Sequence, residues 1–436
     1  MKPIHVGILG LGTVGSGVFK VLQRNREEIA RRAGREIRVT QVSARDVPRV
    51  QAIVGADVQV LADPMAIVRS PDVDIVCELM GGTTLAKQLV LAAIDAGKHV
   101  VTANKALLAE HGNEIFAAAH RKGVMVAFEA AVAGGIPIIK ALREGLTANR
   151  IEWLAGIING TSNFILSEMR DKGMSFEAAL ADAQRLGYAE ADPSFDIDGI
   201  DAAHKLTILA AIAFGVPVQF SRAYTEGIAH LAKEDILYAE QLGYRIKLIG
   251  LARRAAQGIE LRVHPTLVPE RRVIANINGA MNAVVVKGDA VGQTLYSGAG
   301  AGSEPTASAV IADLVDVTRL QTADPDHRVP HLAFQADALA DTPILPIDDV
   351  VTAYYLRLRV ADEPGVLATL ARILADAQIS IDAVLQKEAA EEEHQTDLIV
   401  LTHRTVEREM NRALAQMQRL PSVMAPIVRI RLEQLN

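Results

Sequence analysis

The chain has 436 residues, enough for roughly two to four domains. Half of the residues are apolar, 22% are charged and the formal net charge is −7; this balance excludes a disordered chain and argues against a general nucleic-acid binder. The single cysteine, Cys77, excludes an intrachain disulfide framework and a cysteine-rich metal site. Because neither a secretory leader nor a membrane-spanning run is evident, we expect a soluble, cytoplasmic protein with no membrane partner.

The first part of the chain alternates strand-like and helix-like patterns. Short apolar runs at 4–9, 37–43, 74–79, 98–102 and 123–130 predict strands, and helical spacing occupies 14–29 and 84–96. Strands separated by helices predict parallel βαβ units, and therefore a Rossmann-type doubly wound sheet.

The middle of the chain follows a different pattern. Helical spacing dominates to about Tyr244, with Ser175 as the expected N-cap of one helix. Alternating residues then predict strands at 247–253, 259–264, 272–277 and 282–286, in a mixed or antiparallel sheet. A glycine-rich loop at 298–302 precedes a further helix to about Leu320, and four prolines mark a linker after it.

The last part of the chain starts a new pattern. Strands at 354–360, 379–386, 395–401 and 427–432 alternate with helices at 366–377 and 405–420, and this βαββαβ order predicts a ferredoxin-like domain. The acidic run at 391–393 predicts a solvated hairpin tip. We expect a dinucleotide domain at 1–134 completed by helix 305–322, an α+β substrate and dimerisation domain at 135–304, a linker at 323–349 and a final domain at 350–436.

A glycine motif lies directly after the first predicted strand. The residues Gly10, Leu11, Gly12, Thr13, Val14 and Gly15 fit GxGxxG and open a helix, so we expect a nicotinamide dinucleotide with its pyrophosphate on that helix N-terminus. After the second predicted strand, Arg45 favours the 2′-phosphate of NADP. The neighbouring Asp46 suits the 2′-hydroxyl of NAD; we expect NADP and keep NAD as the alternative.

Two lysines have surroundings suited to proton transfer. Lys105 lies just past the carboxyl end of a predicted strand, where such sheets bind ligands. Lys205 lies four residues after Asp201, on one face of a helix that continues with apolar residues. Burial would bring the pKa of Lys205 into a useful range for acid–base catalysis; a surface ion pair is the alternative. We expect His204 to serve packing and Cys77 to be inert.

Taken together, these motifs resemble the bacterial homoserine dehydrogenases of the long form, which carry a C-terminal ACT domain. Besides the glycine motif, the resemblance rests on segments 78–82, 101–105, 129–137, 157–163, 187–205 and 302–306 and spans essentially the whole chain. It implies the reversible NAD(P)H-dependent reduction of L-aspartate 4-semialdehyde to L-homoserine, on the route to threonine and methionine.

The resemblance also implies roles for individual residues. Lys205 and Lys105 would transfer the proton at the substrate oxygen. The substrate-binding positions would be Glu190, Asp201, Gly187, Asn159, Gly160 and Thr161. The cofactor-binding positions would be Gly10, Leu11, Gly12, Thr13, Val14, Gly15, Arg45, Thr102, Lys105 and Gly302. A site for a monovalent cation such as sodium, made largely of backbone oxygens, would comprise Glu129, Val132, Gly134 and Ile136.

For the C-terminal domain, the resemblance implies regulation. Asp362, Gly365, Val366 and Leu367 match the turn where ACT modules bind amino acids, so threonine is the expected effector and a homodimer or homotetramer the expected assembly. A degenerate domain that only assists assembly is the alternative. Two rival functions are a dehydrogenase for another small amino acid and a nucleotide-binding sensor; the sensor has no need of Lys105, Glu190, Asp201 and Lys205 together.

Overall fold

A computed structural model describes residues 2–386 and 394–436. The acidic run predicted as a hairpin tip, 391–393, lies outside the described residues. The chain divides into two compact units. The first comprises Met1–Gly160, Asp201–Ala223 and Ala280–Thr342, and the second comprises Thr161–Ile200, Tyr224–Gly279 and Pro343–Asn436. No helix within the described ranges is long and apolar enough to cross a membrane.

The first unit contains the predicted doubly wound sheet. Its six parallel strands follow the order β3-β2-β1-β4-β5-β6. The strands are β1 (Ile4–Leu9), β2 (Ile37–Ser43), β3 (Gln59–Leu61), β4 (Ile75–Glu78), β5 (His99–Thr102) and β6 (Val126–Ala127). Strand order reverses between β1 and β4, and the crevice at the carboxyl ends of these two strands is where such sheets bind ligands.

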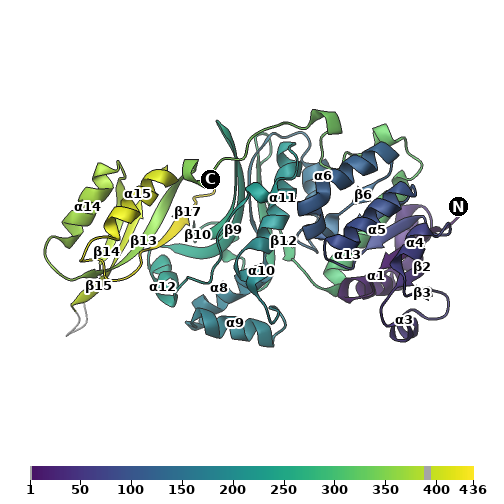
Figure 1. The fold of residues 1–436 in the computed structure, drawn as a ribbon, viewed down its shortest axis with the longest axis horizontal. Helices are drawn as coiled ribbons and strands as arrows, with labels where there is room; N and C mark the ends of the chain where they lie inside the picture. The colour runs from purple at the N-terminus through teal and green to yellow at the C-terminus, as the bar shows by residue number, and fades with distance from the viewer. Residues whose placement is uncertain (1, 387–393) are drawn as a thin grey trace. The chain divides into compact units, whose positions relative to one another are not determined.

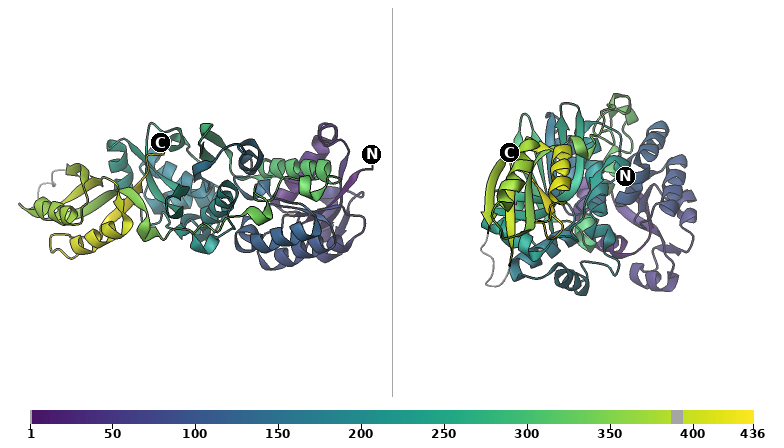
Figure 2. Two further views of the ribbon diagram at one scale, coloured as in Figure 1. Left: turned by 90° about the horizontal axis from the view of Figure 1, so that it is seen from above. Right: turned by 60° about the vertical axis from the view of Figure 1, so that its left-hand side comes forward.

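Helices cover both faces of this sheet. They are α1 (Thr13–Arg24), α2 (Arg26–Ala33), α3 (Val47–Val54), α4 (Pro64–Arg69), α5 (Thr84–Asp95), α6 (Lys105–Lys122) and α13 (Ser303–Leu320). Apolar residues of α1, α2 and α13 pack with those of β1 and β4 in one core. Figure 1 shows α5 and α6 side by side, and the left view of Figure 2 shows them on the face away from α13. The late helix α13 therefore packs on the doubly wound sheet, although it follows β6 by many residues.

The remainder of the first unit adds an antiparallel group of strands. In it β11 (Met281–Gly288) pairs with β7 (Ile151–Ile157) on one side and with β12 (Gly292–Ala299) on the other. The buried helix α11 (Ile200–Phe214) belongs to the same unit. The shorter elements are η1 (Glu129–Ala131), α7 (Ile138–Lys140), η2 (Ala141–Gly145), η3 (Phe220–Arg222), η5 (Pro325–His327) and η6 (Ala336–Ala338).

The second unit contains the predicted βαββαβ module. Its elements are β13 (Val351–Ala361), α14 (Val366–Asp376), β14 (Ile381–Gln386), β15 (Gln395–Thr402), β16 (Thr405–Val406), α15 (Glu407–Met417) and β17 (Val428–Leu432). Figure 1 shows α14 and α15 together on this sheet, and their apolar faces share one core with β13 and β15. The other elements of the unit are α8 (Gly160–Lys172), α9 (Phe176–Arg185), α10 (Ser194–Ile197), β8 (Tyr224–Thr225), α12 (Lys233–Gln241), β9 (Tyr244–Ala255), β10 (Gly258–Pro269), η4 (Val273–Asn276) and η7 (Ile347–Asp349).

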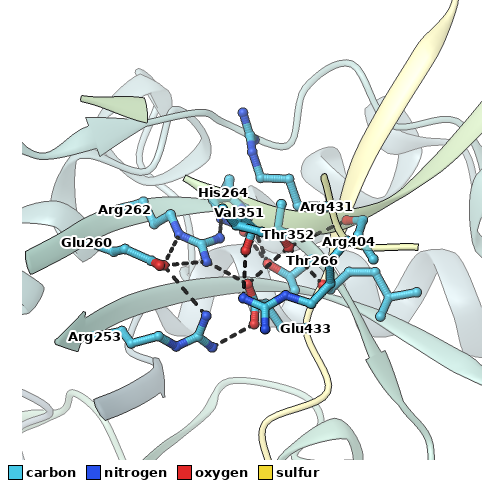
Figure 3. Close-up of polar contacts among 12 residues, drawn as sticks. Arg253, Glu260, Arg262, His264, Thr266, Val351, Thr352, Arg404, Arg431 and Glu433 are labelled. Carbon is cyan, nitrogen blue, oxygen red and sulfur yellow. Dashed lines mark hydrogen bonds and ion pairs between the residues drawn. The ribbon is translucent and has the colours of Figure 1, made fainter. Parts of the chain in front are cut away.

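The last strand joins this module to the β9–β10 hairpin. β17 pairs antiparallel with β13 and parallel with β10. Just past β17, the buried Glu433 accepts hydrogen bonds from Arg253 and Arg262 of the hairpin at 2.7 and 2.5 Å, as Figure 3 shows. Arg262 is wholly buried and also donates to Glu260 and His264. Since each buried charge here has a partner, the hairpin and the module are held together by a balanced ion network.

Several predicted elements need correction. The helix predicted at 14–29 is two helices separated at Asn25, which caps both. The strand predicted at 272–277 is the 3₁₀ turn η4, because alternation over so few residues also fits a turn that buries Ile274 and Ala275. The strand predicted at 123–130 shrinks to β6, since Gly123 ends α6 in a left-handed conformation. The glycine-containing edge strand β12 was not predicted.

Candidate active site

The glycine turn between β1 and α1 has the geometry that a dinucleotide requires. Gly10 adopts a positive φ of +90°, and a Cβ on Gly15 would lie 2.3 Å from the Gly10 carbonyl oxygen. Gly12 is the N-cap of α1, and a Cβ built there meets no atom within 4 Å. Open space before backbone N–H groups at a helix N-terminus fits a pyrophosphate. A second helix, α13, begins at Gly302 and packs here, with Ser303 donating to the Thr13 carbonyl at 2.8 Å.

Just past the end of β2 lie the exposed Arg45 and the carboxylate of Asp46, which already caps a helix. Asp46 caps α3 by accepting a hydrogen bond from the Arg49 backbone N–H at 3.1 Å. Arg45 is exposed in the loop before it. Ser43 accepts from the Gly10 N–H at 3.2 Å, so this strand end is tied to the glycine turn. A basic group is therefore available to a ribose substituent, whereas the Asp46 carboxylate holds its own helix.

Two lysines meet at one buried carboxylate in the first unit. Asp201 lies in the first turn of α11, and its Oδ2 accepts from Lys205 at 2.6 Å. Its Oδ1 forms an ion pair with Lys105 at 2.8 Å, from the first residue of α6. The Lys205 ammonium also donates to the Ile158 carbonyl at 2.8 Å. The structure thus brings together two lysines that are distant in sequence.

Burial and charge act in opposite directions on this cluster. Burial disfavours the ionised Asp201, but the Lys205 and Lys105 ammoniums outweigh it and hold the pKa of that carboxyl far below its usual range. The Asp201 side chain is 3% exposed and that of Lys205 11%, whereas Lys105 is 34% exposed. The cluster therefore carries an excess positive charge, at a place where water is largely excluded, and this suits an oxygen that gains negative charge.

Neighbouring side chains support the cluster. Asn159 donates its amide to Asp201 Oδ2 at 2.9 Å, so its side chain orients the carboxylate. His204 packs its ring against Phe220 at 4.2 Å between centroids, and burial lowers its pKa. The backbone oxygen of Ile158 was not among the predicted site atoms, because a carbonyl leaves no signal in the choice of side chain. Gly160 belongs to the same unit, and a Cβ at this position would lie too close to the Ala280 carbonyl oxygen.

Three predicted substrate positions belong to the second unit. Thr161, in the first turn of α8, donates to the Tyr188 carbonyl at 2.6 Å and so holds the loop after α9. Gly187 has a positive φ of +78° at the start of that loop. Glu190 is exposed, and its backbone carbonyl accepts from Gln184. The loop therefore presents a carboxylate on a well-anchored backbone.

The loop predicted to hold a cation is a close-packed turn of the first unit. Ala133 and Gly134 have positive φ values of 55° and 33°, and a Cβ on Gly134 would lie 2.6 Å from the Gly300 oxygen. The Glu129 carboxylate accepts from the backbone N–H groups of Ile139 and Lys140, so both of its oxygens are already engaged. Within the described chain, no group of three His, Cys, Asp or Glu side chains could hold a metal.

The predicted effector turn is exposed at the start of α14. Gly365 is the N-cap with φ of +95°, and Asp362 donates its backbone N–H to the His394 carbonyl at 2.9 Å. Val366 and Leu367 form the first turn of the helix, and Leu367 is 42% exposed. A backbone N–H terminus beside an apolar side chain can receive a small amino acid.

A cavity of the first unit lies apart from these residues. It measures about 430 Å³ and lies in the first unit, among the C-terminal half of α6, the end of α13 and the segment 325–339. None of the predicted catalytic, substrate or cofactor residues lines it. The candidate active site is therefore identified by its side chains and not by this cavity.

The chain is similar to known proteins along its whole length. Family models for the homoserine dehydrogenase NAD-binding domain, homoserine dehydrogenase and the ACT domain match residues 10–129, 137–315 and 354–421. A homoserine dehydrogenase of Pseudomonas aeruginosa is 64% identical over the full length of both chains. The crystal structure of a homoserine dehydrogenase from Thiobacillus denitrificans is similar with a TM-score of 0.95 and 69% identity, covering 100% of this chain and 99% of that one. A hyperthermophilic archaeal homoserine dehydrogenase mutant in complex with NADPH has a TM-score of 0.64 and 25% identity, covering 74% and 99%.

Proposed function

The chain belongs to the homoserine dehydrogenases, NAD(P)-dependent oxidoreductases that act on a CH–OH group, and from this premise we propose how its residues perform the reaction. The substrate pair is L-homoserine and L-aspartate 4-semialdehyde, and Lys205 transfers the proton with Lys105 beside it. The observation that carries this assignment is the pairing of both ammoniums with the one buried carboxylate of Asp201.

The lysines supply the proton and the positive charge. A nicotinamide held at the glycine turn would supply the hydride chemistry at the substrate carbon that bears the reacting oxygen. In the reductive direction, the Lys205 ammonium gives a proton to the oxygen as negative charge develops on it, and in the oxidative direction the neutral amine takes that proton back. Asp201 and the Ile158 carbonyl fix the amine in place, and Lys105 stabilises the developing charge.

Glu190 is the proposed partner of the substrate ammonium, with Gly187, Asn159, Gly160 and Thr161 lining the site. Its exposed carboxylate is supported in this role by the tied backbone of its loop. We expect Glu190→Gln to raise KM for L-homoserine about 10- to 100-fold, the range for losing a charge-assisted hydrogen bond. The KM for 4-hydroxybutyrate, which lacks the ammonium, should not change. Initial rates with both substrates check this. An equal effect on the two would place the substrate ammonium elsewhere.

Turnover by purified protein tests the activity itself. L-homoserine is supplied with NADP or NAD in turn, and formation of reduced nicotinamide is followed by its absorbance. L-serine, which is one methylene shorter, serves as the control substrate. We expect turnover with L-homoserine and little with L-serine. Preference for another small amino acid would reassign the substrate but keep the dehydrogenase class.

NADP is the proposed cofactor, held by Gly10 to Gly15, Thr102, Lys105 and Gly302. The exposed Arg45, the engaged Asp46 carboxylate and the archaeal relative in complex with NADPH support it. We expect Arg45→Gln to raise KM for NADP about tenfold or more and to leave KM for NAD unchanged, because only NADP presents a phosphate to this arginine. Arg38→Gln, which replaces an exposed arginine within β2, is the matched control. Equal loss with both cofactors would argue against a 2′-phosphate contact.

A monovalent cation such as sodium is proposed for the loop at Glu129, Val132, Gly134 and Ile136. The support is the turn geometry and the capping role of the Glu129 carboxylate, which leaves backbone oxygens as donors. Such an ion would be structural.

Feedback control by threonine through the ACT module is proposed, with the effector at Asp362, Gly365, Val366 and Leu367. The exposed N-terminus of α14 supports the site. A homodimer or homotetramer is the proposed assembly. Threonine can inhibit only by favouring a less active arrangement of the protein, since it would bind away from the substrate. Such control fits an enzyme on the route to threonine and methionine.

A further inference from the structure

One buried carboxylate of the first unit has no role in the mechanism above. Glu78 is the last residue of β4 and is wholly buried. It lies opposite Thr102, the last residue of β5, in the parallel register. Both residues therefore end their strands at the edge of the sheet where the cofactor is proposed to bind.

The Glu78 carboxylate holds two loops at once. Its Oε1 accepts from the backbone N–H groups of Met80 and Gly81 at 2.9 and 3.1 Å. Its Oε2 accepts from the Thr102 hydroxyl at 2.8 Å. Thr102 in turn accepts from the Asn104 N–H at 3.0 Å. Charge-assisted hydrogen bonds of this kind are among the stronger ones in proteins.

Asn104 closes the network. Its amide donates to the Gly82 carbonyl at 2.7 Å, and its Oδ1 accepts from the Leu107 N–H at 3.1 Å and so caps α6. The loop after β4 and the loop after β5 are thereby joined in a ring of hydrogen bonds that starts and ends at Glu78.

Both ends of the ring adjoin the candidate active site. The residue after Asn104 is Lys105, whose ammonium pairs with Asp201. On the other side, a Cβ on Gly10 would lie 2.9 Å from Met80 Cγ and 3.3 Å from the Leu79 oxygen, so the loop after β4 packs on the glycine turn. A shift of either loop would move Lys105 relative to the cofactor turn.

We propose that Glu78 is a positioning residue that sets Lys105 against the nicotinamide end of the cofactor site through Thr102 and Asn104. This inference rests on the proton-transfer role proposed for Lys105. The carboxylate acts because it accepts from donors on both loops. An amide in its place carries no charge and offers only one accepting oxygen, so its nitrogen can meet the Thr102 hydroxyl only if that hydroxyl stops donating and accepts instead.

Glu78→Gln tests the proposal. We expect kcat at saturating L-homoserine and NADP to fall about 10- to 100-fold, as for a catalytic group displaced by about an ångström. The dissociation constant of NADP, measured by calorimetry, should change by less than about threefold. Thr102→Val, which removes the bridging hydroxyl at nearly constant volume, should reproduce the loss, and Thr102→Ser should lose less than Thr102→Val.

The control and the combined variant decide between positioning and a general structural effect. Thr318→Val removes a buried hydroxyl that has no hydrogen-bond partner in the described chain, and it should leave kcat unchanged. In a Lys105→Ala background, Glu78→Gln should lower kcat little further, because it acts through the lysine that is already gone. A fully additive loss would overturn the proposal, as would a loss confined to NADP affinity.

These variants distinguish failure of the Glu78 proposal from failure of the role proposed for Lys105. If Lys105→Ala lowers kcat while Glu78→Gln and Thr102→Val leave it unchanged, the role of Lys105 survives and positioning by Glu78 is wrong. If Lys105→Ala itself leaves kcat unchanged, the role of Lys105 is wrong, and with it the route by which Glu78 was inferred to act. Should Glu78→Gln fold poorly, Thr102→Val decides through its kcat at saturating NADP, because Thr102 is also proposed to contact the cofactor and saturation removes any loss of cofactor affinity.

Discussion

Replacing Lys205 by alanine is expected to lower kcat about 10²- to 10⁴-fold, the usual contribution of a general acid–base group. Affinity for NADP should remain nearly unchanged. Lys205 is bound to Asp201 and the Ile158 carbonyl, whereas the cofactor is proposed to bind at the glycine turn. The loss therefore falls on proton transfer. Steady-state rates with L-homoserine and calorimetric titration with NADP measure the two quantities separately.

Two further variants test whether Lys205 acts by proton transfer, rather than through its positive charge or its buried packing. Lys205→Arg keeps a positive charge but cannot release its proton near neutral pH, so it should be nearly as impaired as the alanine variant. Lys98→Ala removes another buried lysine, which binds the carbonyl oxygens of Ser70 and Val73 in the same unit. It should lower stability without lowering kcat. Normal turnover by Lys205→Ala would show that the acid–base assignment is wrong.

Deleting the chain from Val350 onward is expected to abolish inhibition by threonine and to spare part of the activity, at a large cost in stability. The deletion removes β17, so β10 loses one of its two parallel neighbours and keeps only the short β8. It also removes Glu433, and the wholly buried Arg262 then shares Glu260 with Arg253 (Figure 3). An uncompensated buried charge costs about 3–5 kcal/mol. Thermal unfolding and inhibition curves measure both effects.

A substitution at the predicted effector turn tests regulation separately from the packing of the C-terminal module. Gly365→Val replaces a residue at φ of +95°, a conformation that β-branched residues rarely adopt, and it lies away from the ion network. We expect threonine inhibition to be lost, with a local backbone strain of about 1–3 kcal/mol that is smaller than the loss of stability expected for the deletion. Glu433→Gln removes a charge from the ion network, so we expect it to lower the unfolding temperature. If threonine still inhibits the Val350 deletion, its site lies elsewhere in the chain.

Local sequence was sufficient where a structure is made within one element. The helix cap at Ser175 was predicted correctly, and its side chain accepts from Ala178. The Asp201 and Lys205 pair was found from a spacing of four residues on a helix face. The strand 272–277 was predicted wrongly, because a short alternation does not distinguish a strand from the 3₁₀ turn η4 that follows β10.

By itself, the order of residues determined the parallel sheet, the βαββαβ module, the glycine turn and the candidate lysines. Each of these can be inferred from short-range periodicity or spacing. Only the tertiary structure decided that Lys105 reaches Asp201, that Glu78 lies opposite Thr102 and that the final strand lies between β10 and β13. These contacts join residues whose separation along the chain carries no periodic signal. They arise when strands align and buried charges find partners, and both of these depend on the whole fold.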